Sequence, residues 1–213
     1  MKSSPPATSK NTYTMKARAE TMATTRERIV REGLKLAVEL PYEDITLTAI
    51  AEAAGVSHQT VLNHYASKEG VAAAAAELLA RETAERRQAA VPGDLPGAIA
   101  ILLDDYERFG DANARWAMSS ERLGSLARFL EEARAGHQAW LEHIFTGSLP
   151  KPAAARRRAI HALHAATDVY TWKLLRRDLK LTRDDTERIM MDLVRGTLGT
   201  LGAAAASASK RPR

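Results

Sequence analysis

The chain has 213 residues, and 31 lysines and arginines against 26 acidic residues give it a formal net charge of +5. It contains no cysteine, which excludes disulfides, thiolate zinc sites and iron–sulfur clusters. No apolar run approaches the roughly 20 residues needed to cross a bilayer, and the polar first 25 residues lack a secretory signal, so we expect a cytoplasmic protein. Only 5% of the residues are aromatic and alanine is abundant, which favours an all-α fold.

The N-terminal part of the chain consists of a polar segment followed by a segment in which apolar residues recur at helical intervals. Residues 1–20 are rich in Ser, Thr, Pro and Lys without an apolar period, which predicts a disordered arm. A first helix is predicted over about 23–40, where apolar and small residues recur at steps of three and four until Pro41. The basic charge of this region suits a phosphate backbone, although a solvated tail before a mixed-charge helix would carry the same charges.

Two short helices are predicted next. Thr46 offers a hydroxyl cap to the first, which ends at Gly55, a residue able to take the left-handed conformation. Ser57 caps the second almost immediately, and this helix runs through Tyr65. An alanine-rich helix, capped by a serine, follows over about 67–87.

Prolines and glycine within 92–96 separate this N-terminal part from a body of longer helices. We place the boundary in the last turns of the preceding helix, which gives an N-terminal domain over 21–87, a helical body over 88–204 and a fraying tail over 205–213. Glycine and proline positions divide the body into predicted helices near 95–109, 112–122, 126–146, 153–178 and 183–204.

The segment from Thr46 to Tyr65 has the anatomy of a helix-turn-helix, because two short capped helices flank a tight turn. Its apolar residues are expected to close a small core with the first helix. The other face of the second short helix carries polar side chains that can read base edges in a major groove. These side chains belong to His58, Gln59, Thr60, Asn63 and His64.

The sequence TLTAIAEAAGVSHQTVLNHYASKE, from Thr46 to Glu69, resembles the DNA-binding domain of the TetR family of bacterial transcriptional regulators. The resemblance covers about fifty residues from Arg26 onward and includes Ile-Ala before the turn, Gly-Val-Ser within it and His-Tyr after it. It implies an N-terminal helix-turn-helix domain of three helices and a fourth helix that leads to a C-terminal body for effector binding and dimerisation. It also implies that the last two helices pair with a second copy.

By position, the resemblance assigns Thr46 and Lys68 to phosphate contacts and places further residues along the groove. At Leu62 the family usually has a tyrosine that reaches a phosphate, so we expect Leu62 to contact sugar or a thymine methyl, or to pack inward. Gln59 stands where the family often has glycine, and its amide can pair with adenine. The alternative is that these residues only cap helices or face solvent. The expected DNA-binding set is Thr46, Thr48, Ser57, His58, Gln59, Thr60, Asn63, His64 and Lys68.

A single helix-turn-helix reads few base pairs, so we expect a homodimer that engages two half-sites. Stripes on the last two predicted helices are the candidate interface, and a glycine-weakened, fraying C-terminus is the alternative. The interface set is Ile160, Leu163, Tyr170, Leu174, Ile189, Leu193, Gly196, Thr197 and Leu201.

The body also gathers aromatic and polar residues, a composition typical of a pocket for an unknown small-molecule effector. Ordinary core packing would explain many of the same residues. The candidate effector-binding set is Tyr106, Phe109, Trp116, His137, Trp140, His164, Asp168 and Trp172.

No cofactor and no metal site are expected. His161, His164 and Asp168 lie on adjacent helical turns, but the chain lacks the Glu-x-x-His and His-Glu-x-x-His patterns of helical metal centres. Phosphate-loop, dinucleotide and Gly-x-Ser-x-Gly motifs are also missing. We therefore expect a ligand-responsive regulator, most simply a repressor on a palindromic operator. A nonspecific or architectural DNA-binding protein is the alternative, and a helical enzyme using histidines and aspartate of the body is a distant one.

Overall fold

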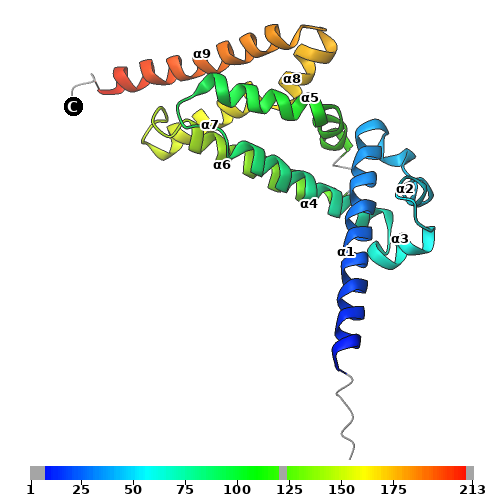
Figure 1. The fold of residues 1–213 in the computed structure, drawn as a ribbon. Helices are drawn as coiled ribbons and strands as arrows, with labels where there is room; N and C mark the ends of the chain where they lie inside the picture. Colours follow the sequence, from blue (N-terminus) through cyan, green and yellow to red (C-terminus); the bar gives the residue numbers. More distant parts are fainter. Residues whose placement is uncertain (1–7, 120–123, 210–213) are drawn as a thin grey trace, which may run out of the picture. The chain divides into compact units, whose positions relative to one another are not determined.

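The computed structural model of the chain describes residues 8–119 and 124–209, with side chains over 20–118 and 127–200. Helices account for the regular structure of these ranges, which contain no strand, so the predicted all-α fold is confirmed (Figure 1). The chain divides into two compact units, Met1–Leu78 and Leu79–Arg213. The elements are α1 (Thr8–Glu39), η1 (Tyr42–Asp44), α2 (Leu47–Ala53), α3 (His58–Tyr65), α4 (Lys68–Arg87), α5 (Leu95–Ser119), α6 (Gly124–Ile144), α7 (Ala153–Thr167), α8 (Val169–Lys173), η2 (Leu174–Asp178) and α9 (Arg183–Ser209).

The N-terminal unit packs α2 and α3 against α1, as Figure 1 shows. Ile29 of α1, Ile50 of α2 and Val61 of α3 are buried, so each helix contributes one fully desolvated β-branched side chain. At Gly33 of α1, an added Cβ would lie only 2.9 Å from Cγ1 of Val71 in α4. Glycine at this position therefore lets α4 approach α1 closely.

The first helix begins earlier than predicted. Helix α1 starts at Thr8, so residues 8–20 are helical rather than a disordered arm. The predicted arm has no apolar stripe, but it also has no helix breaker between Pro6 and Gly33. Lysine, arginine, methionine and alanine, which are good helix formers, recur in this stretch and favour the helix.

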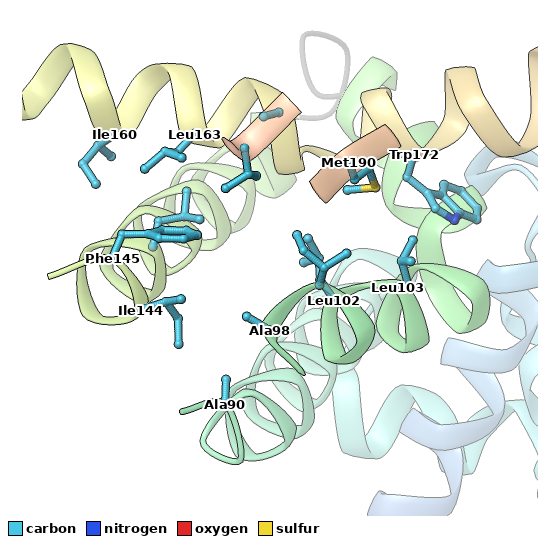
Figure 2. Packing of buried hydrophobic residues seen from close by; sticks show 14 of the residues in the cluster. Ala90, Ala98, Leu102, Leu103, Ile144, Phe145, Ile160, Leu163, Trp172 and Met190 are labelled. Carbon is cyan, nitrogen blue, oxygen red and sulfur yellow. The ribbon is translucent and has the colours of Figure 1, made fainter. Parts of the chain in front are cut away.

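The second unit has its own hydrophobic core, built by α5, α6, α7, α8 and α9. Figure 2 shows Leu102 and Leu103 of α5 near Met190 of α9, with Ile160 and Leu163 on α7 and Trp172 at one end of the cluster. The side chains of Leu102, Leu163 and Trp172 are fully buried. At roughly 1.5–3 kcal/mol for each fully buried large apolar side chain, this cluster is the main stabilising feature of the unit.

Helix α5 is continuous, whereas a break was predicted at Gly110. The glycine faces the indole of Trp172, and a Cβ at this position would overlap the ring. Gly110 thus serves close packing rather than helix termination, and the favourable packing of Trp172 outweighs the roughly 1 kcal/mol cost of an internal glycine.

The predicted single helix over 153–178 is divided at Asp168, which has an extended backbone with φ −72° and ψ 154°. Its side chain accepts a hydrogen bond from the amide of Tyr170 at 2.8 Å and so caps α8. A π-helical turn, η2, follows α8. Helix α9 runs to Ser209, beyond the predicted end near 204, so part of the predicted tail is helical.

Within 8–119 and 124–209, no helix combines the length and the apolar character needed to cross a bilayer.

Candidate functional site

The turn between α2 and α3 is built by local hydrogen bonds that the sequence predicts. The Thr46 hydroxyl accepts from the amide of Ala49 at 3.0 Å, and the Ser57 hydroxyl accepts from the amide of Thr60 at 3.1 Å. Gly55 adopts a positive φ of 61° between the two helices. These caps confirm the predicted starts of both helices and fix the short connection between them.

One face of α3 is anchored in the unit. Val61 is fully buried, and the Tyr65 hydroxyl donates a 2.9 Å hydrogen bond to the carbonyl of Arg26 in α1. The Arg26 guanidinium also lies 4.9 Å from the centre of the Tyr65 ring. Burial raises the pKa of Tyr65, so the phenol remains a neutral donor. Helix α3 is therefore fixed to α1 through its C-terminal turn.

The opposite face of α3 is open to solvent. His58, Gln59 and Asn63 are exposed, as is Thr48 on α2. The Gln59 side-chain amide donates a 2.9 Å hydrogen bond to the Asn63 side-chain oxygen. This bond pre-orients two amides whose remaining donors and acceptors match the edges of bases in a major groove.

The other residues predicted to lie along the groove are less exposed to solvent or already take part in hydrogen bonds. Thr60 and His64 are half-buried, and the hydroxyl groups of Thr60 and Ser57 form a hydrogen bond of 2.8 Å. Leu62 is also half-buried. Thr46 and Ser57 are exposed while they cap their helices, so capping and DNA contact are compatible at both positions.

Lys68 is held by the fold more firmly than the sequence indicates. Its ammonium donates a 2.9 Å hydrogen bond to the backbone carbonyl of Tyr42 and lies 4.2 Å from the centre of the Tyr42 ring. The Tyr42 hydroxyl donates in turn to Glu69, at 3.1 Å, and burial together with the Glu69 charge raises the pKa of Tyr42 to about 12. An ammonium has three donors, so Lys68 can contact a phosphate from this fixed position.

In the second unit, a buried carboxylate holds the end of α4. Asp105 of α5 is only 3% exposed and accepts hydrogen bonds from Nε of Arg86 at 2.6 Å and from Nε of Arg87 at 3.3 Å. The indole of Trp140 in α6 donates to the carbonyl of Arg87 at 3.3 Å, and its ring lies 5.2 Å below the Arg87 guanidinium. We call Arg86, Arg87, Asp105 and Trp140 the α4 clamp.

His137 extends this arrangement into the core. Nη1 of Arg87 lies 3.1 Å from Nδ1 of His137, and since a guanidinium can only donate, Nδ1 must accept. Nε2 then carries the proton and donates to the Thr167 hydroxyl at 2.9 Å, and this hydroxyl donates to the carbonyl of Leu163 at 2.8 Å. Burial, reinforced by the charge of Arg87, lowers the pKa of His137 to about 3. His137 is therefore a neutral, fully hydrogen-bonded side chain.

A second histidine lies against the first at the break between α7 and α8. The rings of His137 and His164 meet edge to face with centres 4.8 Å apart, and Nε2 of His164 lies 3.0 Å from a carboxylate oxygen of Asp168. Burial disfavours the charge of Asp168, but hydrogen bonds from His164 and the Tyr170 amide keep the pKa of Asp168 below its usual value. Tyr106 completes the group by donating to the carbonyl of Thr167 at 2.9 Å.

The candidate effector residues thus separate into those that form this connected polar cluster and those that do not. His137, Trp140, His164, Asp168 and Tyr106 are brought together.

Phe109, Trp116 and Trp172 lie outside the polar cluster. Phe109 is half-buried beneath the Arg86 guanidinium, and the buried indole nitrogen of Trp116 has no hydrogen-bond partner among the described residues. Trp172 is fully buried against Gly110, and its indole donates to Glu107 at 3.2 Å. It packs in the hydrophobic core of the second unit, apart from the polar cluster.

The residues of the predicted dimer interface fall into a buried group and a group at the surface. Ile160 and Leu163 pack into the core of their own unit and are not available to a second copy, which corrects the expectation for these two residues. Helical periodicity alone could not distinguish which apolar face α7 turns inward. Tyr170, Leu174 and Leu193 are exposed by 43%, 49% and 44%.

The remaining residues of the stripe lie at or near the surface. Gly196 is exposed with nothing within 4 Å of a Cβ placed there, and Ile189 and Thr197 are half-buried. The side chain of Leu201 lies outside the described ones.

Sequence reasoning missed the carboxylate and the arginines of the α4 clamp. A signal was present, because Asp105 follows Leu102 by one helical turn on the apolar face of α5, where an ionised residue needs a partner. Two consecutive arginines end the preceding helix. Among the described residues, no group of histidine and carboxylate side chains has the arrangement of a metal site.

Comparisons with known proteins find a family for the part of the chain that holds α2 and α3. Residues 29–75 match the family described as "Bacterial regulatory proteins, tetR family". The HTH-type transcriptional regulatory protein RaaS of Mycobacterium tuberculosis is 34% identical over 86 residues, and this match spans 40% of the chain and only 41% of that relative.

Solved structures extend the likeness of fold to the second unit. A tetR-family transcriptional regulator from Streptomyces coelicolor has a TM-score of 0.71 and 16% identity, covering 87% of this chain and 83% of the other. The SmeT–triclosan complex has a TM-score of 0.59 and 17% identity, covering 83% and 91%.

Proposed function

The N-terminal unit belongs to the tetR family of bacterial regulatory proteins, and from this premise we propose that the whole chain is a ligand-responsive transcriptional repressor. It binds a palindromic operator as a homodimer in the cytoplasm and is released by a small-molecule effector. The family consists of transcriptional regulators rather than enzymes.

The observation that carries this proposal is the solvent-open polar face of α3. His58, Gln59 and Asn63 are exposed on a helix whose other face is anchored by Val61 and Tyr65. A rigid helix with two exposed amides and an exposed imidazole is suited to direct readout in a major groove. The helix N-termini at Thr46 and Ser57 and the ammonium of Lys68 would hold the phosphates on either side.

Homodimerisation is supported by the apolar surface of α8, η2 and α9. Tyr170, Leu174 and Leu193 leave large apolar side chains in solvent, which is costly for a monomer when several occur together. At Gly196 and Gly199 an added Cβ would meet open space, so a partner helix could approach the α9 backbone there. Ile160 and Leu163 are excluded from this surface because they lie in the core.

Effector binding is assigned to the polar cluster of the second unit. His137, His164, Asp168 and Tyr106 bring polar groups together beside aromatic rings, the combination that orients a small molecule in an otherwise apolar site. The likeness of fold to the SmeT–triclosan complex supports a ligand-binding role for this unit. Release would require the effector to bind the DNA-free form more tightly, and each 1.4 kcal/mol of difference lowers DNA affinity about tenfold.

The proposal is tested by selecting bound fragments from a random DNA pool and measuring the mass of the protein and of its DNA complex in solution. We expect an enriched palindrome and two chains per duplex. A pool without enrichment would indicate the nonspecific or architectural DNA-binding alternative, and a 23.3 kDa monomer on DNA would refute the two-half-site arrangement.

A further inference from the structure

The helix-turn-helix of α2 and α3 contains no basic side chain apart from its histidines. The chain has no lysine or arginine between Lys35 and Lys68, although this stretch contains four carboxylates. All four carboxylates are exposed to solvent, and they belong to Glu39, Glu43, Asp44 and Glu52. Since proteins bind the DNA backbone largely through lysine and arginine, the charge of this stretch opposes binding to phosphates.

The rest of residues 20–78 does not reverse this balance. This range contains nine aspartates and glutamates and five lysines and arginines, so its formal charge is −4. Two of the five cations are paired within α1. Arg31 lies 3.0 Å from Glu27, and Lys35 lies 2.7 Å from Glu32. A DNA-binding unit with this charge needs a further source of cations.

The first turns of α1 have the opposite composition. Residues 8–19 are helical and belong to the same compact unit as α3. They contain no acidic residue and three cations, Lys10, Lys16 and Arg18, which we call the α1 cations. The segment has no apolar period, so a contribution to the hydrophobic core does not explain why it extends the helix.

Helix α1 connects the α1 cations to the attachment point of α3 without a break. The Tyr65 hydroxyl of α3 donates to the carbonyl of Arg26 at 2.9 Å, and Figure 1 shows α1 continuing past α3 towards its N-terminal end. Arg18 and Lys10 precede Arg26 by eight and sixteen residues, which correspond to about 12 and 24 Å of helix. Phosphates of one DNA strand are about 3.4 Å apart, so this length spans several nucleotides.

We propose that the α1 cations bind DNA phosphates outside the base pairs that α3 reads, and that they supply most of the electrostatic affinity of the N-terminal unit for DNA. This inference rests on the proposed function. Contacts to phosphates carry no sequence information, so the α1 cations strengthen binding to every DNA sequence alike. The polar face of α3 then selects among the sequences.

The experiment measures the salt dependence of DNA binding by an α1 variant that combines Lys10→Gln, Lys16→Gln and Arg18→Gln. Glutamine removes the charge and is a good helix former, so the helix is expected to persist. Each lost phosphate contact lowers the slope of log K against log salt concentration by about 0.9, which predicts a slope smaller by about 2.7 for each DNA-binding unit. Affinities for the selected palindrome and for a scrambled duplex should fall by the same factor, at least about tenfold at 0.1 M salt.

The matched control removes the same net charge from the second unit. It combines Lys151→Gln, Arg157→Gln and Arg158→Gln, which replace three exposed cations at and near the start of α7, and it should keep the wild-type slope. An equal decrease of the slope in both variants would indicate a general effect of net charge and overturn the proposal. An unchanged slope in the α1 variant would overturn it as well.

A milder substitution decides the question if the α1 variant fails to fold. Arg18→Gln alone should lower the slope by about 0.9 for each DNA-binding unit, and a slope equal to that of wild type would overturn the proposal. Failure of the wild-type protein to prefer any palindrome would instead refute the proposed function. The difference in slope between the α1 variant and the control can be measured on any duplex, so the two failures are distinguishable.

Discussion

Acidification should destabilise the second unit through one buried histidine. His137 is 7% exposed, and its pKa is lowered from 6.5 to about 3 by burial and by the charge of Arg87. At pH values between these two pKa values, the imidazole of His137 is protonated in the unfolded chain but not in the folded one. The free energy of unfolding is therefore highest above pH 6.5 and falls as the pH decreases towards 3. The expected loss is about 1.4 kcal/mol at pH 5.5 and about 2 kcal/mol at pH 5.0.

The assay is urea unfolding monitored by tryptophan fluorescence at pH 8.0 and 5.0. All three tryptophans, Trp116, Trp140 and Trp172, lie in the second unit, so the signal reports on this unit. His137→Gln should be less stable than wild type at pH 8.0 but should lose much less stability on acidification. His143→Gln, at an exposed histidine, is the control and should keep the wild-type pH dependence. A wild-type midpoint that does not change between the two pH values would refute the reasoning.

Three further substitutions test packing and readout. Gly110→Ala should destabilise the second unit by about 1–2 kcal/mol in urea unfolding, because overlap with the buried Trp172 ring outweighs the gain in helix propensity; a stabilised variant would contradict this packing. Gln59→Ala should change the base preferred at one operator position in a DNA selection, and an unchanged preference would remove Gln59 from base readout. Lys68→Ala should weaken binding to all sequences alike and reduce the salt slope by about 0.9, whereas an unchanged slope would rule out a phosphate contact.

The DNA-binding unit could be predicted from the sequence because its signals are local. Thr46 and Ser57 cap helices through atoms three residues away, and Gly55 supplies the positive φ that the turn requires. Short-range hydrogen bonds of this kind leave a readable pattern of residue types. The exposed polar face of α3 follows from the same helical periodicity that buries Val61.

Prediction failed where a residue's role depends on a distant part of the chain. Gly110 ends no helix, because its partner is the ring of Trp172 more than sixty residues later. Ile160 and Leu163 form a regular stripe, but only the packing of α5 and α9 shows that this stripe faces the core. Residues 8–20 show the converse: they form a helix although their sequence has no apolar period.

The α4 clamp could not be assembled from the sequence, although each member has a recognisable character. Arg87, Asp105 and Trp140 lie on three different helices, and no spacing rule relates them. Only the fold places the carboxylate between both arginines and directs Arg87 to an acceptor nitrogen of His137. The neutral state of this histidine is likewise a consequence of burial.

The affinity of the protein for its selected palindrome, relative to a scrambled duplex of equal length at physiological salt, tests the central claim most directly. A sequence-specific regulator is expected to prefer the palindrome by at least about a thousandfold. Equal affinities for the two duplexes would contradict sequence readout by the exposed face of α3.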